Sequence, residues 1–536
     1  MDRSIKLRFG ATLLSASSIL LASSTSLAED LMSTYQLAIK NDANWAAKKA
    51  HYLAEREGVE QAFGTMLPIV DLNARYAQQE YDGATLDIEG LKTDDCIDGL
   101  GAEEPTVGAC IDLINEFSNL GTKQTTESYT TESYGLSINQ PLFRMDRWYG
   151  YKVQKSLESR AQSDLAFQQQ ELIVRVSEAY FGVLRAEEEL RLAKSEEASL
   201  ETQLTEIKNR YKLGLARDTD LFEVQAGYDI TKAARLNAEG LVDNVKEDLR
   251  LLTRQSTVLV NPLPTNIPIE PPKPLEVADW EEYAKQNNYQ VIAAQFAVDA
   301  SATQVKQKRS GHAPTVDLFF DYRKSETGGG FTPSSTTQTI GVNLRMPIFE
   351  GGITSSQEKQ ARHQADEAKQ NKEFAQRNAV RETRQYHRRV MTDVYTVNAH
   401  ERAVRSNNSA YRSIKIGYES GLRSLTDLLS AQKKVFSARK ELVTARYDYI
   451  LDTLKLKRAS GILSPNDLEV LNSWLDEPTT NTLTRSNETE ALSLEEIDGI
   501  KLKKESGPVA FEEKEKKKRS SHKSLYDAFK AWRKDE

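Results

Sequence analysis

The sequence has few cysteines and histidines, and the motifs that usually carry enzyme chemistry are missing from it. Only two cysteines and six histidines occur in 536 residues, and the histidines are scattered without metal-ligand spacing. No serine nucleophile elbow or phosphate-binding glycine loop is present, and Gly328-Gly329-Gly330 is typical of a loop tip. The formal net charge of −8 disfavours nucleic-acid binding. We therefore expect no enzymatic activity, no cofactor, no metal and no nucleic-acid partner.

Long apolar runs are also missing after the first 28 residues. None approaches the roughly 20 residues that a membrane helix needs, and the mean hydropathy is −0.57. A membrane β-barrel escapes this test, because its strands are short and only every second residue is apolar. Residues 1–28 combine a positive start, an apolar stretch and Ser26-Leu27-Ala28. This pattern predicts a secretory signal peptide and an exported protein.

The two cysteines, Cys96 and Cys110, lie close together in a polar segment. An exported protein meets an oxidising compartment, so an even pair at this spacing suggests one disulfide. Two free thiols are the alternative.

Proline is absent from two stretches of more than a hundred residues, Leu142 to Asn261 and Ile348 to Ser464. Both stretches are rich in strong helix formers and carry apolar residues at heptad spacing. Gly214 and Gly421 lie mid-stretch, each followed by Thr-Asp and a new apolar pattern, which is typical of one helix ending and another beginning. Each stretch is predicted to form a long helical hairpin, with arms of roughly 100 Å.

The chain consists of two copies of one unit. Three pairs of segments carry the repeat: Pro68-Ile69-Val70-Asp71-Leu72 with Pro314-Thr315-Val316-Asp317-Leu318, Ile138-Asn139-Gln140-Pro141-Leu142-Phe143 with Leu344-Arg345-Met346-Pro347-Ile348-Phe349, and Gly214-Leu215 plus Thr219-Asp220 with Gly421-Leu422 plus Thr426-Asp427.

Each copy contains two short segments in which apolar and polar residues alternate. Val70, Leu72 and Tyr76 are an example in the first copy, and Val342 and Leu344 in the second. Period two predicts strands. An apolar face opposite a charged face suits lipid outside and water inside. A half-buried sheet of a soluble domain is the alternative.

The order of these features, together with Tyr418-Glu419-Ser420-Gly421-Leu422-Arg423 and Thr426-Asp427-Leu428-Leu429, resembles the TolC family of outer-membrane efflux proteins over residues 29 to about 475. The resemblance implies an α+β membrane protein. Three chains, with four strands each, would form one 12-stranded β-barrel, continued by a long α-helical barrel with a mixed α/β equatorial region.

The predicted organisation follows from the repeat and the resemblance. Its segments are a signal peptide (1–28), the first helix of repeat 1 (29–67), two strands with a long extracellular loop (68–142), hairpin 1 (143–261), a Pro-rich equatorial connector (262–285), the first helix of repeat 2 (286–313), two strands with a loop (314–348), hairpin 2 (349–463), and an equatorial segment with a polar, basic, disordered tail (464–536).

The resemblance also implies a function. The protein would be the passive exit duct of a tripartite efflux pump or a type I secretion system, exporting drugs, small toxic compounds or proteins and so contributing to multidrug resistance. It would be a homotrimer in outer-membrane lipid that extends into the periplasm. Its partners would be a periplasmic adaptor and an inner-membrane pump of the RND, ABC or MFS type. A periplasmic coiled-coil adaptor or scaffold protein is the alternative.

Two sets of site residues come from the resemblance. The hairpin tips, where an adaptor would dock, are Gly214, Leu215, Gly421 and Leu422. A periplasmic gate would involve Thr219, Asp220, Tyr418, Arg423 and Asp427, with three copies of Asp427 forming a carboxylate ring in the lumen. The family has a second acid one turn further on. Ser430 stands there, so a weaker cation site is expected. Thr219, Asp220 and Asp427 also suit ordinary helix starts.

Overall fold

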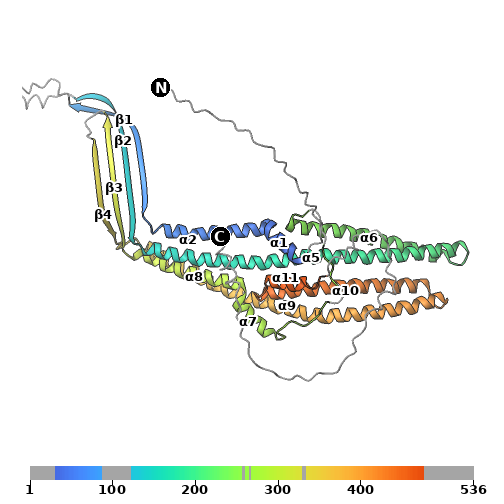
Figure 1. Ribbon diagram of the computed structural model, residues 1–536. Coiled ribbons are helices and arrows are strands. Elements are labelled where there is room, and N and C mark those ends of the chain that lie inside the picture. The colour runs from blue at the N-terminus through green and yellow to red at the C-terminus, as the bar shows by residue number, and fades with distance from the viewer. Residues whose placement is uncertain (1–29, 87–121, 256–259, 265–266, 329–333, 476–536) are drawn as a thin grey trace, which may run out of the picture. The chain divides into compact units, whose positions relative to one another are not determined.

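The computed structural model describes residues 30–86, 122–255, 260–264, 267–328 and 334–475 (Figure 1). All of them belong to the first of the two units into which the chain divides, Met1–Thr482. The predicted signal peptide, the cysteine pair Cys96 and Cys110, and the basic tail lie outside the described residues.

Four strands form one antiparallel sheet in the order β1-β2-β3-β4. The pairing of β2 with β3 joins the two halves of the chain, and β1 and β4 are the two edges of the sheet. The register shifts between Pro141 and Phe143, where β2 leaves the sheet. The strands are β1 (Ile69–Leu86), β2 (Thr122–Phe143), β3 (Thr315–Gly328) and β4 (Ser335–Arg345).

Phe319 interrupts the alternation of apolar and polar residues in β3, and a glycine on the next strand makes room for its ring. Phe319 pairs with Gly341 of β4. A Cβ built on Gly341 would lie 2.8 Å from the Phe319 ring, which is too close for any larger side chain. The pair keeps β3 and β4 in register despite the bulky residue.

The helices repeat between the two halves. In each half a short helix and a longer one precede the strands, and a long hairpin follows them. Figure 1 shows α5 beside α6 and α9 beside α10, and each pair is in contact along its length. The first half contains α1 (Leu31–Asn41), α2 (Ala43–Gly64), α5 (Met145–Lys212) and α6 (Asp218–Thr253). The second contains α7 (Val277–Asn287), α8 (Tyr289–Arg309), η1 (Ser310–His312), α9 (Ile353–Glu419), α10 (Leu425–Ala459) and α11 (Pro465–Asn472).

The segment expected as one first helix, 29–67, is two helices that meet at Asp42. The backbone of Asp42 is extended there, and its carboxylate accepts hydrogen bonds from the backbone N–H groups of Asn44 and Trp45. Asn288 caps α8 in the same way at the corresponding place of the second half. One polar cap residue is enough to end and restart a helix without proline or glycine.

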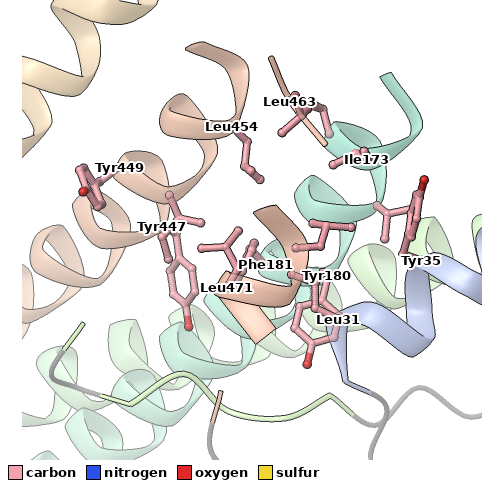
Figure 2. Packing of buried hydrophobic residues seen from close by; sticks show 14 of the residues in the cluster. Leu31, Tyr35, Ile173, Tyr180, Phe181, Tyr447, Tyr449, Leu454, Leu463 and Leu471 are labelled. Carbon is pink, nitrogen blue, oxygen red and sulfur yellow. The ribbon is translucent and has the colours of Figure 1, made fainter. Parts of the chain in front are cut away.

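The largest apolar core lies where α1, α5, α10 and α11 meet (Figure 2). Tyr180 and Phe181 of α5 are fully buried there, with their rings edge-to-face at 5.7 Å. The Tyr180 hydroxyl accepts a hydrogen bond from the backbone N–H of Asn261, 3.0 Å away, and so fastens the Pro-rich connector to α5. Leu463 and Leu471, beyond the second hairpin, complete the core.

None of the described helices is both long enough and apolar enough to cross a membrane.

Candidate functional site

One face of the sheet presents apolar side chains that nothing in the described part of the chain covers. Leu72 on β1 is 81% exposed, and Ile340, Val342 and Leu344 on β4 are exposed to a similar degree. These residues alternate with polar ones, as the sequence pattern predicts. Apolar side chains exposed on both edge strands of one sheet face indicate a lipid or protein contact surface.

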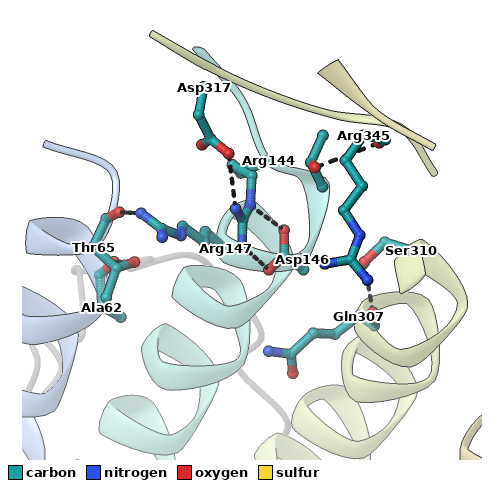
Figure 3. A network of polar contacts seen from close by, with 10 residues as sticks. Ala62, Thr65, Arg144, Asp146, Arg147, Gln307, Ser310, Asp317 and Arg345 are labelled. Atoms are coloured by element: carbon teal, nitrogen blue, oxygen red, sulfur yellow. Dashed lines mark hydrogen bonds and ion pairs between the residues drawn. The ribbon is translucent and has the colours of Figure 1, made fainter. Parts of the chain in front are cut away.

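A polar network joins the sheet to the helices (Figure 3). Arg144 lies between β2 and α5 and forms ion pairs with Asp146 of α5 and Asp317 of β3, each at 3.2 Å. Arg147 donates to the backbone carbonyl of Thr65, just after α2. These contacts hold the ends of three elements together, although the residues come from both halves of the chain.

The predicted hairpin tips lie in the turns between the long helices. Gly214 and Gly421 have φ of +70° and +73°, a left-handed conformation that glycine adopts without steric cost. The next residues, Leu215 and Leu422, are 74% and 83% exposed. Both turns therefore present an apolar side chain to the surroundings.

Two of the predicted gate acids cap the second helix of their hairpins. Asp427 accepts a hydrogen bond from the backbone N–H of Ser424 at 3.3 Å, and its own N–H donates to the Ser424 hydroxyl at 3.1 Å. Asp220 accepts from the backbone N–H of Arg217 at 3.3 Å. Thr219 is exposed in the first turn of α6. The capping role of these acids, weighed from the sequence beside the gate role, is confirmed.

Tyr418, near the end of α9, lies against the other hairpin. The guanidinium of Arg210 on α5 lies 5.9 Å from the centre of its ring, a cation–π distance. Burial raises the pKa of the Tyr418 hydroxyl, and the charges of Glu206 and Asp220 raise it further, while Arg210 opposes the shift. The hydroxyl is therefore a neutral hydrogen-bond donor near the acids of the first hairpin.

Arg423 follows the second turn and is exposed. Its side-chain stem lies over Gly417, where an added Cβ would come within 2.8 Å of the Arg423 Cγ. Among the described residues its guanidinium has neither an ion pair nor a hydrogen bond. The structure thus brings Tyr418 and Asp220 near each other and leaves Arg423 free to meet another group.

Sequence reasoning missed the polar contacts between α5 and α10, which belong to different hairpins. Gln432 on α10 bonds to Ser199 and Gln203 on α5. Lys440 pairs with Glu189 at 3.1 Å. Long-range pairs of this kind leave no motif in the sequence, because each residue looks like an ordinary polar position on its own helix.

The described part of the chain shows no cluster of side chains of the kind that holds a metal ion. No group of three or more His, Cys, Asp or Glu side chains converges there. One hollow of the described chain, of about 690 Å³, is an open groove between α5, α8 and α9. Alanines and side-chain amides make up most of its wall, and Asp164 and Glu367 are its only acids. The described chain consists mainly of long helices, the turns that join them, and polar contacts between neighbouring helices.

Comparison with known proteins agrees with this organisation. The outer membrane efflux protein family matches residues 34–253 and 280–462, a range that contains both hairpins. Outer membrane protein TolC of Vibrio cholerae is 30% identical over 458 residues, which cover 84% of this chain and 95% of that protein. The alkaline protease secretion protein AprF of Pseudomonas aeruginosa is 27% identical over 364 residues, covering 67% of this chain and 75% of that protein.

Solved structures share the fold. The CmeC outer membrane channel of Campylobacter jejuni superposes with a TM-score of 0.63 at 17% identity, over 91% of this chain and 98% of that one. The outer membrane protein VceC of Vibrio cholerae gives a TM-score of 0.61 at 16% identity, over 80% and 96%. The chain belongs to the outer membrane efflux protein family, and it is an outer-membrane exit duct for efflux or secretion rather than an enzyme.

Proposed function

We propose that three copies of this chain form one 12-stranded β-barrel, continued by an α-helical tunnel made from the long hairpins. The observation that carries this proposal is the sheet of one chain, which has two open edges, β1 and β4, and an exposed apolar face. Unpaired strand edges are not tolerated in lipid. Four strands cannot enclose a lumen either, since even eight-stranded barrels are filled by side chains. Closure by threefold symmetry satisfies both requirements.

The equatorial region is assigned to the connector, residues 262–285, and to the segment that begins at Ser464. Support comes from α7 and α11, which belong to these segments and are much shorter than the hairpin helices. Size measurement by light scattering in detergent tests the assembly: a trimer is expected, and a stable folded monomer would contradict it.

The transport that we propose is passive, with energy supplied by an inner-membrane pump of the RND, ABC or MFS type through a periplasmic adaptor. Support comes from the names of relatives, which include a protease secretion protein and an efflux pump outer membrane protein. A deletion strain, screened for antibiotic sensitivity and for lost secreted proteins, separates drug efflux from protein secretion. A strain unchanged in both respects would contradict the proposal.

A periplasmic adaptor is the second candidate, because it too can be built from long helical hairpins. The exposed apolar sheet face favours the exit duct, since an adaptor needs no surface for lipid. Membrane flotation separates the two: an exit duct floats with the outer membrane, whereas an adaptor does not.

The gate is proposed near the hairpin tips and involves Thr219, Asp220, Tyr418, Arg423 and Asp427. The position of Tyr418 between the two hairpins supports this, and the unpaired guanidinium of Arg423 suits a contact with a neighbouring copy. Each exposed tie contributes about 0.2–1 kcal/mol. Tyr418→Phe combined with Arg423→Ser should therefore raise conductance across a planar bilayer, and unchanged conductance in an intact assembly would contradict the gate.

The cysteine pair, Cys96 and Cys110, is proposed to form a disulfide in the loop between β1 and β2. An exported protein folds in an oxidising compartment, which favours the bond. Mass measurement after alkylation without reduction should find no labelled thiol, and two labels would contradict the pairing.

A further inference from the structure

We propose that the buried side chain of Gln432 is a latch that holds the α9–α10 hairpin against the α5–α6 hairpin, deeper in the protein than the gate residues. This inference rests on the proposed exit-duct function. It assigns Gln432 a positioning role in keeping the duct closed.

The geometry of the latch is an amide with two partners on the other hairpin. Gln432 is only 3% exposed. Its Nε2 donates to the Ser199 hydroxyl at 3.0 Å, and its Oε1 accepts from Nε2 of Gln203. Both partners belong to α5, and Gln432 lies seven residues after the start of α10 at Leu425. At 1.5 Å per residue, this places the latch about 10 Å along α10 from its tip.

The apolar surroundings of Gln432 increase the contribution of its hydrogen bonds to the packing of the two hairpins. Leu428, Ala431 and Val435, its neighbours on α10, are all buried apolar residues. A polar group in such surroundings is costly when it loses its partner, whereas an exposed group simply turns to water. Removing the Gln432 amide would strand the donor of Gln203. The part-buried bonds of Gln432 should therefore oppose separation of the hairpins more strongly than one exposed tie at the tip.

One feature of the same cluster favours separation of α10 from α5. The Oε1 atom of Gln203 is buried and has no hydrogen-bond partner among the described residues. The packed arrangement thus leaves one acceptor unsatisfied, which water would satisfy once α10 moved away from α5. The bonds of Gln432 favour the packed state, and the unpaired oxygen of Gln203 limits that preference.

The contacts on either side of the latch are of a different kind. Towards the tip, the Thr426 hydroxyl donates to Glu223 at 3.0 Å, and both groups lie at the surface. Away from the tip, Lys440–Glu189 at 3.1 Å and Lys455–Glu178 at 2.7 Å are ion pairs. Ion pairs with exposed members contribute little and weaken with salt. Gln432 is the buried, uncharged contact between these two groups, so its effect should not depend on salt.

The test is planar-bilayer conductance of the assembled protein carrying Gln432→Met. This change keeps the length of the side chain and removes both hydrogen bonds. The ratio of open to closed channels should rise about 5- to 100-fold, the range expected for one buried polar contact. Gln225→Met is the matched control, because within the described chain Gln225 bonds to Asp229 on its own helix and not to the other hairpin. It should conduct like the parent at low and at high salt.

Ser199→Ala removes one of the two bonds with the loss of a single oxygen atom, and it serves if Gln432→Met fails to assemble. It should shift the ratio in the same direction by about 2- to 5-fold. Parent-like conductance of both variants would overturn the latch, and if Tyr418→Phe with Arg423→Ser still opened the channel, the gate would stand. Absence of conductance in the parent and in every variant would overturn the exit-duct function itself.

Discussion

Arg144 and Asp317 lie 3.2 Å apart, although 173 residues separate them in the sequence. Arg144 follows β2 in the first half of the chain, and Asp317 belongs to β3 in the second half. Their ion pair therefore joins the two copies of the repeat at the point where the sheet meets the helices (Figure 3). Both side chains are largely shielded from water, so the pair should matter more than a surface ion pair.

Replacing Asp317 by Asn should lower the stability of the protein by about 1–2 kcal/mol, because a partly buried bond to a charged group is lost. Asp146→Asn is the matched control, since Asp146 also contacts Arg144 but is more exposed. Loss of helical circular dichroism on heating measures the effect. Asp317→Asn should reduce the midpoint temperature more than Asp146→Asn, and equal effects would argue against a structural role for the longer-range pair.

Gly461 should tolerate substitution far less than Gly214, although both have positive φ. A Cβ on Gly461 would lie 2.3 Å from the backbone oxygen of Asn287, whereas no described residue beyond its chain neighbours lies within 4 Å of one on Gly214. Gly214→Ala should cost about 1 kcal/mol, the penalty of the left-handed conformation alone. Gly461→Ala should cost about 3 kcal/mol more, because the backbone must shift. Thermal unfolding of the two variants compares them directly, and similar midpoints would contradict the clash.

The periodic parts of this fold could be read from the sequence. Alternation predicts strands where β3 and β4 lie, and the proline-free stretches with Gly214 and Gly421 predict the two hairpins. These features are local, so a short window of residues contains the information. The break at Asp42 was missed, because one acidic residue in a helix-forming run has no distinctive pattern.

The contacts between hairpins could not be predicted in the same way. The cation–π contact of Arg210 with Tyr418 and the bonds of Gln432 join residues about 200 positions apart. They depend on which face each long helix turns to its neighbour, and a small rotation of a helix changes every partner. Resemblance to the family led to Tyr418, whereas nothing in the sequence led to Gln432.

The hairpin tips should be sensitive to charge if an adaptor docks there. Leu215 and Leu422 are exposed, so replacing both by Asp should leave the fold intact. An apolar contact with a partner would lose its buried area and gain an unpaired charge, and export should fall at least tenfold. Cellular efflux or secretion assays measure the loss.

Leu251→Asp is the control for the tip variants. Leu251 is 77% exposed but lies at the far end of α6 from the tip. Export should survive this change, whereas the two tip changes together should lower it at least tenfold. Full export by the tip double variant, with its assembly intact, would remove the docking role from both leucines.

Asp393 of α9 lies in a half-buried group of carboxylates with Asp448 and Asp452 of α10. Its Oδ2 atom is buried, and no residue in the described part of the chain forms a hydrogen bond with it. Burial, and after it the charges of Asp452 and Asp448, raise the pKa of Asp393 to about 7, while Arg389 opposes the shift. Arg389 is itself engaged with Asp452 at 3.9 Å. Compared with the unfolded chain, the folded protein therefore favours the protonated form of Asp393.

A carboxyl group whose pKa is higher in the folded state than its ordinary value of 3.8 stabilises the fold at low pH. That contribution is complete below about pH 4 and is lost as the pH rises through about 7, because the folded protein binds the extra proton only in this window.

Asp393→Asn mimics the neutral acid at every pH. The variant should therefore be only modestly more stable than the parent at pH 5, where the unfolded carboxyl is already ionised, and its advantage should be larger at pH 8. Asp366→Asn, at an exposed position of α9, is the control. Its unfolding temperature should change between pH 5 and pH 8 by the same amount as that of the parent. If the difference in unfolding temperature between the parent and Asp393→Asn stayed constant from pH 5 to pH 8, Asp393 would be ionised throughout that range.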